Sequence, residues 1–266
     1  MLTIELSDHP GDLLSAATQR RVSAAAKGNG QLASITKQRD EARARHRWLS
    51  WLRLAIKAGR YRRTRHSVAS HPTEDEEILK AGIAGEQRVA RELGERLNDD
   101  WTLVHGYRNG RGEIDHLLLG PNGLFAIEVK NNNATVSINA DVWAADKFDR
   151  YGNHVEHYAI EDRGGRSPSA QLNQPADALE RFLGARGQPL TIVRIVALAH
   201  ARSRLGAHKN LTVHVAVTTQ EILQVVNAQH DRLDAKRRAA ILSQIQHDHA
   251  FHETRRASRG PARRRR

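Results

Sequence analysis

The pattern of apolar and polar residues predicts a helix and three antiparallel strands near the middle of the chain. From Thr73 to about Leu97, apolar residues recur every three or four positions, which is the spacing of one helix face. Three short apolar runs follow, over 101–107, 113–119 and 124–130, and Asn-Gly and Gly-Pro-Asn-Gly turn sequences separate them. We therefore expect a helix packed on a three-stranded meander.

Thr73 is the expected N-cap of this helix. Glu76 stands three residues later, at the spacing of a capping box, and the acidic run 74–77 suits the positive end of the helix dipole. The preceding residues, 66–73, contain Ser, His and Pro and are interpreted as a linker. A domain boundary is therefore expected near residue 71.

Beyond residue 130, short strands alternate with helices. The near-continuous apolar run 191–199 is typical of a strand that is buried on both faces. Residues 161–168 and 201–210 are expected to be charged or basic loops. The other expected elements are short strands within 131–160, a helix over 169–183, a strand over 211–217, and helices over 218–228 and 231–247.

The first 70 residues have a different pattern. A short helix is expected over 11–26 and a longer one over 31–63, where Ala, Arg, Gln and Leu are abundant. The longer helix has apolar residues at helical spacing and a basic opposite face. These apolar residues are Trp48, Trp51, Leu52 and Ala55. Such a helix could lie on nucleic acid, on the core of the protein or on a membrane surface.

Charge separates the ends of the chain from its centre. The net charge is +12, yet residues 1–70 hold 14 Lys and Arg against 5 Asp and Glu, and residues 255–266 hold seven Arg and no acid. The centre is therefore mildly acidic. Because basic segments attract polyanions, we expect both ends to contact nucleic acid, with a merely solubilising tail as the alternative. The Arg-rich tail over 251–266 is expected to be disordered.

Several classes of protein are disfavoured. No run of about 18 apolar residues exists, so no integral membrane segment is expected. The first residues lack the basic start and apolar stretch of a secretory signal. The chain has no cysteine, which rules out disulfides and cysteine metal sites and fits a cytoplasmic protein.

Three charged residues, Asp115, Glu128 and Lys130, interrupt the otherwise apolar strands over 113–119 and 124–130. Because side chains alternate along a strand, Glu128 and Lys130 share a face, and Asp115 meets them if the two strands pair there. Two carboxylates can hold a hard divalent cation, and a lysine beside them can orient water and stabilise charge on a phosphate. A cross-strand salt bridge is the simpler alternative.

Glu86 is the one polar member of the buried stripe of the preceding helix. The stripe consists of Leu79, Ile83, Glu86, Ala90, Leu93 and Leu97. A glutamate at such a position either reaches the edge of the helix and pairs with a basic residue or points at a polar site on the sheet below. In the second case Glu86 joins Glu128 and Lys130 from above.

Three segments of this region, Gly85-Glu86, 112–118 and 120–131, carry a resemblance to a known family. They resemble the nuclease-related domain, a branch of the PD-(D/E)XK nuclease superfamily, and the likeness covers roughly 81–199. The resemblance implies an α/β fold with a restriction-endonuclease-like αβββαβ core, in which helices flank a mixed central sheet. We place this domain at 71–250, after a basic and largely helical extension over 1–70.

The resemblance also implies an activity: a divalent-metal-dependent nuclease that acts on DNA or, as the alternative, on RNA, in DNA processing or defence. The ion would be Mg²⁺ or Mn²⁺. Asp115, Glu128 and the helix-borne Glu86 would bind it, and Lys130 would be the catalytic lysine.

The second core helix of the family starts with Asn-Pro-x-x-Gln, and this chain has Ser167-Pro168-Ser169-Ala170-Gln171. Gln171 matches and joins the site as a phosphate or water contact. Ser167 departs from the pattern, which leaves its capping role open. Two alternatives remain: a catalytically silent nucleic-acid-binding or adaptor protein, and a signalling or membrane-associated protein located by its Trp- and Arg-rich helix.

Overall fold

The chain divides into two compact units. The computed structural model describes residues 1–258, and for residues 64–70 it describes the backbone alone. One unit combines Met1–Asp8 with the chain from Gly82 onward, and the other is His9–Ala81. The second unit is therefore an insertion in the first, and its C-terminal boundary falls inside a helix.

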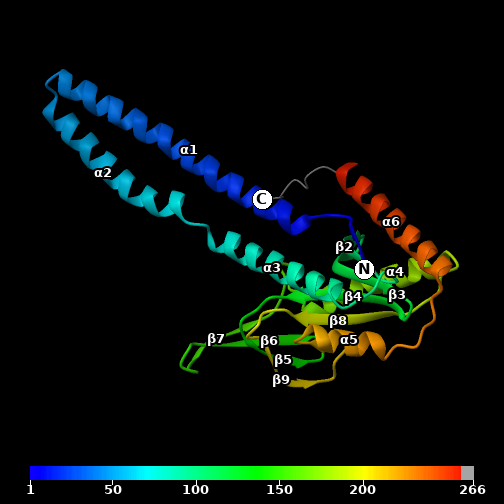
Figure 1. Cartoon of the computed structure of the whole chain (residues 1–266). Helices are drawn as coiled ribbons and strands as arrows, with labels where there is room; N and C mark the ends of the chain where they lie inside the picture. The colour runs from blue at the N-terminus through cyan, green and yellow to red at the C-terminus, as the bar shows by residue number, and fades with distance from the viewer. Residues whose placement is uncertain (259–266) are drawn as a thin grey trace. The chain divides into compact units, whose positions relative to one another are not determined.

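The inserted unit is built on two long helices, α1 (His9–Ala44) and α2 (Trp48–Ser70), which lie side by side (Figure 1). A three-residue turn joins them, and His46 in this turn has a φ of 53°. We expected a break after residue 26, but α1 continues through Gly28 and Gly30. The cost of a helical glycine, about 1 kcal/mol each, is outweighed here by the Ala-rich flanks and by packing on α2.

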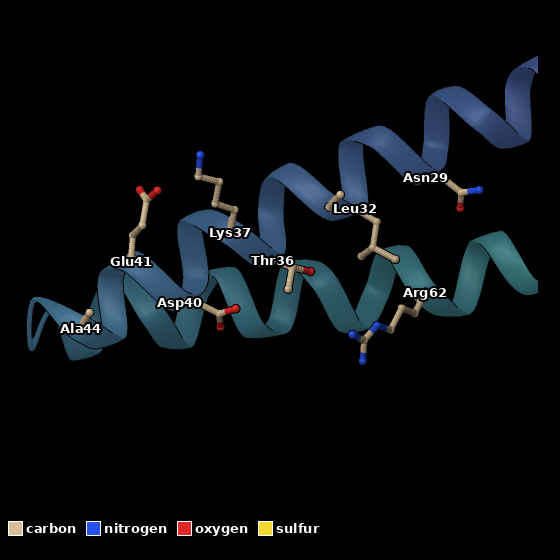
Figure 2. Close-up of a pocket in the computed structure, with 9 residues that line it drawn as sticks. Asn29, Leu32, Thr36, Lys37, Asp40, Glu41, Ala44 and Arg62 are labelled. Carbon is tan, nitrogen blue, oxygen red and sulfur yellow. The ribbon is translucent and has the colours of Figure 1, made fainter.

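The α1–α2 hairpin is hollowed on one side of its surface. A hollow of about 780 Å³ opens there, and Figure 2 shows its lining, which comes from α1 except for Arg62 of α2. Polar side chains such as Lys37, Asp40 and Glu41 surround Leu32 and the small residues of α1. None of the candidate catalytic residues lines this hollow.

The other unit contains a six-stranded mixed sheet with the strand order β1-β2-β3-β4-β8-β10. The antiparallel meander β2-β3-β4 forms its centre, and β1, β8 and β10 are added to it in parallel pairs. The strands are β1 (Leu2–Glu5), β2 (Thr102–Asn109), β3 (Gly112–Gly120), β4 (Gly123–Lys130), β8 (Ile192–Leu198) and β10 (His214–Ala216).

Helices cover both faces of this sheet: α3 (Glu74–Gly94), α4 (Pro168–Ala185), α5 (Thr219–Asn227) and α6 (Ala235–Ser258). The face that carries Phe125 and Ile127 packs against apolar residues of α3 and α5. The opposite face, which carries Leu124 and Ala126, packs against α4 and α6. Burial on both sides explains why β4 and β8 are almost continuously apolar.

A second sheet has the order β7-β6-β5-β9, and its strands lie together in Figure 1. Its inner side chains, including Val136, Ile138 and Trp143, join the core beneath α4. Its strands are β5 (Thr135–Asn139), β6 (Val142–Phe148), β7 (His154–Ala159) and β9 (Arg204–Lys209).

The predicted fold class is confirmed. Helix α3, the β2-β3-β4 meander, α4 and β8 follow one another in the αβββαβ order, and helices flank a mixed sheet. The capping box also forms, because Thr73 N donates to Glu76 Oε2 (2.8 Å) and Glu76 N donates to Thr73 Oγ1 (3.3 Å). The short strands expected between 131 and 160 are β5, β6 and β7.

Several predictions about elements were wrong. The helix expected over 31–63 is interrupted by the turn at 45–47, and the expected linker is helical as far as Ser70, the last residue of α2. One strand, near the N-terminus, was not predicted at all. Residues 2–5 form β1, which pairs with β2 almost 100 residues later in the chain, so no local pattern announces it. Residues 204–209 form β9 rather than part of a loop; this strand is polar because it lies at a sheet edge. Helix α6 extends to Ser258, so residues 251–258 are helical, and the remainder of the expected tail lies outside the described residues.

Candidate active site

The candidate site lies where β3 and β4 separate. Their ladder runs from Gly120↔Gly123 to His116↔Ile127, and beyond this point β4 continues beside β8. The next contact between the two strands is made by a side chain: Asp115 Oδ2 accepts a hydrogen bond from Val129 N (2.7 Å). The carboxylate thus replaces a backbone carbonyl of β3, and this holds it beside the last residues of β4.

Lys130 ends β4 and connects two of the other candidates. Its Nζ donates to Glu128 Oε1 (2.6 Å) and to Gln171 Oε1 (2.9 Å). Glu128 is buried, whereas Lys130 and Gln171 are partly exposed. Buried charges are tolerated when they are paired and hydrogen-bonded, as here. The strand alternation therefore places Glu128 and Lys130 on one face, the face that α4 covers.

Gln171 is held in position by the start of α4. Ser167 is the N-cap, and its hydroxyl accepts a hydrogen bond from Ala170 N (3.2 Å). The side-chain amide of Gln171 donates to the backbone oxygen of Arg166 (2.7 Å), which leaves its amide oxygen directed at Lys130. Ser167 therefore performs the capping role that its departure from Asn had left open.

Glu86 approaches from the other face of the sheet. Helix α3 packs against Val129 and Ile127, not over Glu128 and Lys130 as we expected. Gly85 permits this approach, because a Cβ at this position would lie 2.8 Å from Asn131 Cβ. The side chain of Glu86 is nevertheless close enough to feel the charges of the site. Burial is the main reason why the pKa of Glu86 is raised to about 7, and repulsion by the Glu128 carboxylate is the second.

Two further groups of the site, Asp115 and Lys130, show the same crowding of negative charge. Burial raises the pKa of Asp115 well above its usual value, and the Glu128 and Glu86 carboxylates raise it further. Burial acts to lower the pKa of Lys130, but the Glu128 and Asp115 carboxylates outweigh this effect and leave it above the usual value. One lysine thus faces three carboxyl groups, and the excess negative charge favours protons or a cation.

A family model of the nuclease-related domain matches residues 81–199. Residues 81–199 form a nuclease-related domain. The match begins within α3, ends just after β8 and includes all five candidate residues, namely Glu86, Asp115, Glu128, Lys130 and Gln171. Membership of the PD-(D/E)XK superfamily is consistent with this family. No curated protein and no solved structure matches the chain.

Nuclease-related domains generally use divalent metal ions, and the donors present here fit one. Asp115 and Glu128 supply carboxylate oxygens, which Mg²⁺ and Mn²⁺ prefer. Neighbouring carboxylates repel one another here, as the raised pKa of Asp115 indicates, and a bound cation would offset this repulsion. Among the described residues, no three His, Asp or Glu side chains are placed to hold an ion together. Mg²⁺ is commonly held by one or two carboxylates with water and substrate phosphate, so two are sufficient.

The nuclease-related domain brings Asp115, Glu128, Lys130 and Gln171 together and adds Glu86 electrostatically. Sequence reasoning missed the residues that position this set. Arg166 contributes its backbone oxygen to Gln171 and pairs with Asp162 through Nε (2.8 Å), which shapes the loop before α4. The only available signal was the Asp-x-x-x-Arg spacing in a Gly-rich loop.

His116 is the other positioning residue. Its Nε2 lies 3.3 Å from Glu86 O, and its Nδ1 lies 2.8 Å from His105 Nδ1. Complete burial lowers the pKa of His116 to about 3, so the ring stays neutral and can donate to the α3 carbonyl. This contact holds the backbone of Glu86 against β3. His116 lies on the face of β3 that carries Ile127 of β4, opposite to Asp115.

Proposed function

We propose that the chain is a divalent-metal-dependent nuclease that hydrolyses phosphodiester bonds, in DNA rather than RNA. The observation that carries this proposal is the linked set at the end of β4, in which Lys130 bonds Glu128 and Gln171 while Asp115 bonds the backbone of Val129. A plain salt bridge within β4 would need only Lys130 and Glu128, and it would leave the partly buried Asp115 and the oriented Gln171 without a purpose.

Each side chain has a chemical task in this proposal. Asp115 and Glu128 would hold the ion, which when bound supplies a polarised water and neutralises charge on the phosphate. Lys130 keeps its proton, since its pKa is raised, and its ammonium stabilises negative charge on the phosphate oxygens. Gln171 fixes the position of Lys130 and offers its amide to a phosphate or water. Glu86 approaches from the other face of the sheet and would act on the site through its charge, not as a third ligand of the ion.

The nucleic acid would also contact the basic residues of the first 70 positions and of the C-terminal tail. The centre of the chain is mildly acidic, so these segments supply most of the long-range attraction to a polyanion. Such contacts are independent of base sequence, which suits an enzyme whose site recognises phosphate groups. We place this activity in the cytoplasm, in DNA processing or defence.

A cleavage assay tests the proposal. Supercoiled plasmid, linear DNA and RNA are incubated with the full chain and Mg²⁺ or Mn²⁺, with EDTA as the metal-free condition. Lys130→Ala should reduce cleavage by about 10²–10³-fold, whereas the matched variant Lys147→Ala, at an exposed position on β6, should leave it unchanged. Thermal unfolding and DNA binding are measured in parallel, to show that Lys130→Ala is folded.

Either of two results would contradict the proposal that the chain is an enzyme. If wild type cuts no substrate with either metal yet binds DNA, the chain is a catalytically silent nucleic-acid-binding or adaptor protein. If folded Lys130→Ala cuts as fast as wild type, the cleavage comes from another site or from a contaminant.

A further inference from the structure

Helix α2 presents two different apolar faces. One consists of Trp51, Leu54 and Ala58, which are three or four positions apart and are partly or fully buried, as expected for the side that packs on α1. The other face is exposed. Its side chains and their exposed fractions are Trp48 (67 %), Leu49 (77 %), Leu52 (51 %) and Ile56 (51 %).

The exposed residues form a continuous stripe over the first turns of α2. Trp48, Leu52 and Ile56 are four positions apart and so lie above one another, with Leu49 beside them. Large apolar side chains scattered singly on a surface need no explanation, but a contiguous set at a helix end does. Sequence reasoning had grouped Trp48 and Leu52 with Trp51 on one face. In the structure Trp51 is partly buried and its ring contacts that of Trp48 (centroids 6.3 Å apart), whereas Trp48 and Leu52 are exposed.

Basic residues flank this stripe. Between Trp48 and Arg63, helix α2 has Arg and Lys side chains and no Asp or Glu. Arg53, Lys57 and Arg60 line a shallow hollow of about 310 Å³ together with Ile56, the last residue of the stripe. Positive charge and apolar surface are therefore combined within one site. The basic residues in this stretch are Arg53, Lys57, Arg60, Arg62 and Arg63.

We propose that this face of α2 binds the surface of an anionic lipid membrane. Trp48, Leu49, Leu52 and Ile56 would enter the boundary between headgroups and acyl chains, while Arg53 and Lys57 contact lipid phosphates. An interfacial helix has this composition: Trp and Leu on one side, Arg and Lys on the other, and too few apolar residues in total to enter the bilayer completely. Binding would be peripheral, because no helix within the described residues is both long and apolar enough to span a bilayer.

A second copy of the chain fits this face less well. The apolar stripe ends at Ile56, after little more than two turns, because Gly59 and Arg60 follow. An apolar repeat sustained over about three or four heptads is typical of a coiled coil, and this stripe is much shorter. Two copies of α2 would also bring basic residues together with no acid on either helix to compensate, and this repulsion opposes a dimer.

Nucleic acid matches the charge but not the apolar side chains. Phosphate contacts come from basic and polar groups, and nothing in a duplex backbone covers Leu49, Leu52 and Ile56. A lipid surface satisfies both parts, since it offers phosphate at the level of Arg53 and hydrocarbon below it. The proposal is independent of the nuclease activity, because no residue of the active site takes part in it.

Vesicle co-sedimentation tests the proposal with the purified full chain. The probes are vesicles of phosphatidylcholine alone and vesicles that also contain phosphatidylserine. We expect binding to the anionic vesicles, a blue shift of tryptophan emission, and weaker binding as salt is raised. The double variant Trp48→Ala/Leu52→Ala should bind at least about tenfold more weakly, because two large apolar side chains no longer leave water.

The charged part of the site is tested separately. The double variant Arg53→Gln/Lys57→Gln should weaken binding to anionic vesicles by about fivefold for each charge removed and should reduce the salt dependence. The matched controls are Val142→Ala and Lys147→Gln, an exposed valine and an exposed lysine of β6, and both should bind as wild type does. On the same proteins, light scattering measures the oligomeric state, and a fluorescent oligonucleotide measures nucleic-acid binding.

Any of four results would overturn the proposal. The first is no binding to anionic vesicles by wild type, and the second is equal binding by the Trp48→Ala/Leu52→Ala variant. The third is a wild-type dimer that this variant converts to a monomer without any vesicle binding, which would assign the face to a second copy. The fourth is oligonucleotide binding that the variant loses while vesicle binding is absent, which would assign it to nucleic acid.

Discussion

The molecule contains two hairpins of opposite character. In the strand hairpin β3–β4, most side chains are completely buried, and its three charged candidates are held by hydrogen bonds. In the helical hairpin α1–α2, few of the side chains that the structure describes are buried, an open hollow lies at its surface, and large apolar residues face outward. The first hairpin holds its charged side chains in fixed positions, whereas the second exposes apolar side chains at its surface.

The difference shows what each unit needs from its sequence. A catalytic geometry tolerates little displacement, so the strand hairpin requires close packing around every charge. A surface that binds a deformable partner depends on which residue types it carries more than on the exact position of each side chain. We therefore expect substitutions in the strand hairpin to have large and specific effects and those in the helical hairpin to have small ones. The following predictions test this contrast, beginning with the largest effect.

Replacing Asp115 by Asn should affect catalysis most. The amide oxygen can still accept from Val129 N, so the fold should persist, but a charged metal ligand is lost. Cleavage should fall by about 10²–10³-fold, and the rise in melting temperature that Mg²⁺ or Mn²⁺ gives to wild type should disappear. Glu113→Gln is the matched control on the same strand and should keep both properties. An unchanged metal response in Asp115→Asn would exclude this residue as a ligand.

Gly120→Ala should give the largest loss of stability. A Cβ at this position would lie only 2.1 Å from Trp101 Cε3, within the buried pair of Trp101 and Phe125 rings. Because neither ring can move freely, we expect the free energy of unfolding to fall by about 3 kcal/mol. Gly184→Ala on α4 meets no atom within 4 Å and should be neutral or slightly stabilising. Chemical denaturation compares them, and equal stabilities would mean that the hairpin is loosely packed.

Glu86→Gln should change how stability depends on pH. The pKa of Glu86 rises from 4.5 to about 7 on folding, so between these values the folded chain holds a proton that the unfolded chain releases. The stability of metal-free wild type should therefore fall as pH rises from about 4.5 to 7, and Asp115 acts in the same direction. The variant loses part of this slope, matches wild type at pH 4 and is more stable by roughly 2 kcal/mol at pH 8. Parallel pH profiles would refute the buried position of Glu86.

The smallest effect compares one glycine from each unit. Gly59 on α2 has no atom within 4 Å of a built Cβ, so Gly59→Ala should stabilise the helical hairpin by about 0.5–1 kcal/mol through helix propensity. Gly85 on α3 meets Asn131 Cβ at 2.8 Å, so Gly85→Ala should destabilise by about 1–2 kcal/mol. Circular dichroism melts measure both. The contrast between the two units fails if both substitutions shift the melting temperature in the same direction.

Much of the strand hairpin and its site could be predicted from local signals. The Gly-Pro-Asn-Gly turn set the boundary between β3 and β4, and side-chain alternation placed Glu128 beside Lys130. What could not be predicted depends on contacts between distant segments. The face chosen by α3 follows from the close approach of Gly85 to Asn131, and β1 exists only because β2 is there to pair with it.

The pairing of β1 with β2 also bears on the order in which the molecule is made. β1 precedes the helical hairpin in the chain and β2 follows it, so the first strand has no partner until about 100 further residues have been synthesised. Helices form from local contacts in microseconds, whereas such distant pairings form late. The helical hairpin can therefore be complete, with its outward apolar stripe, before β1 has met its partner strand β2.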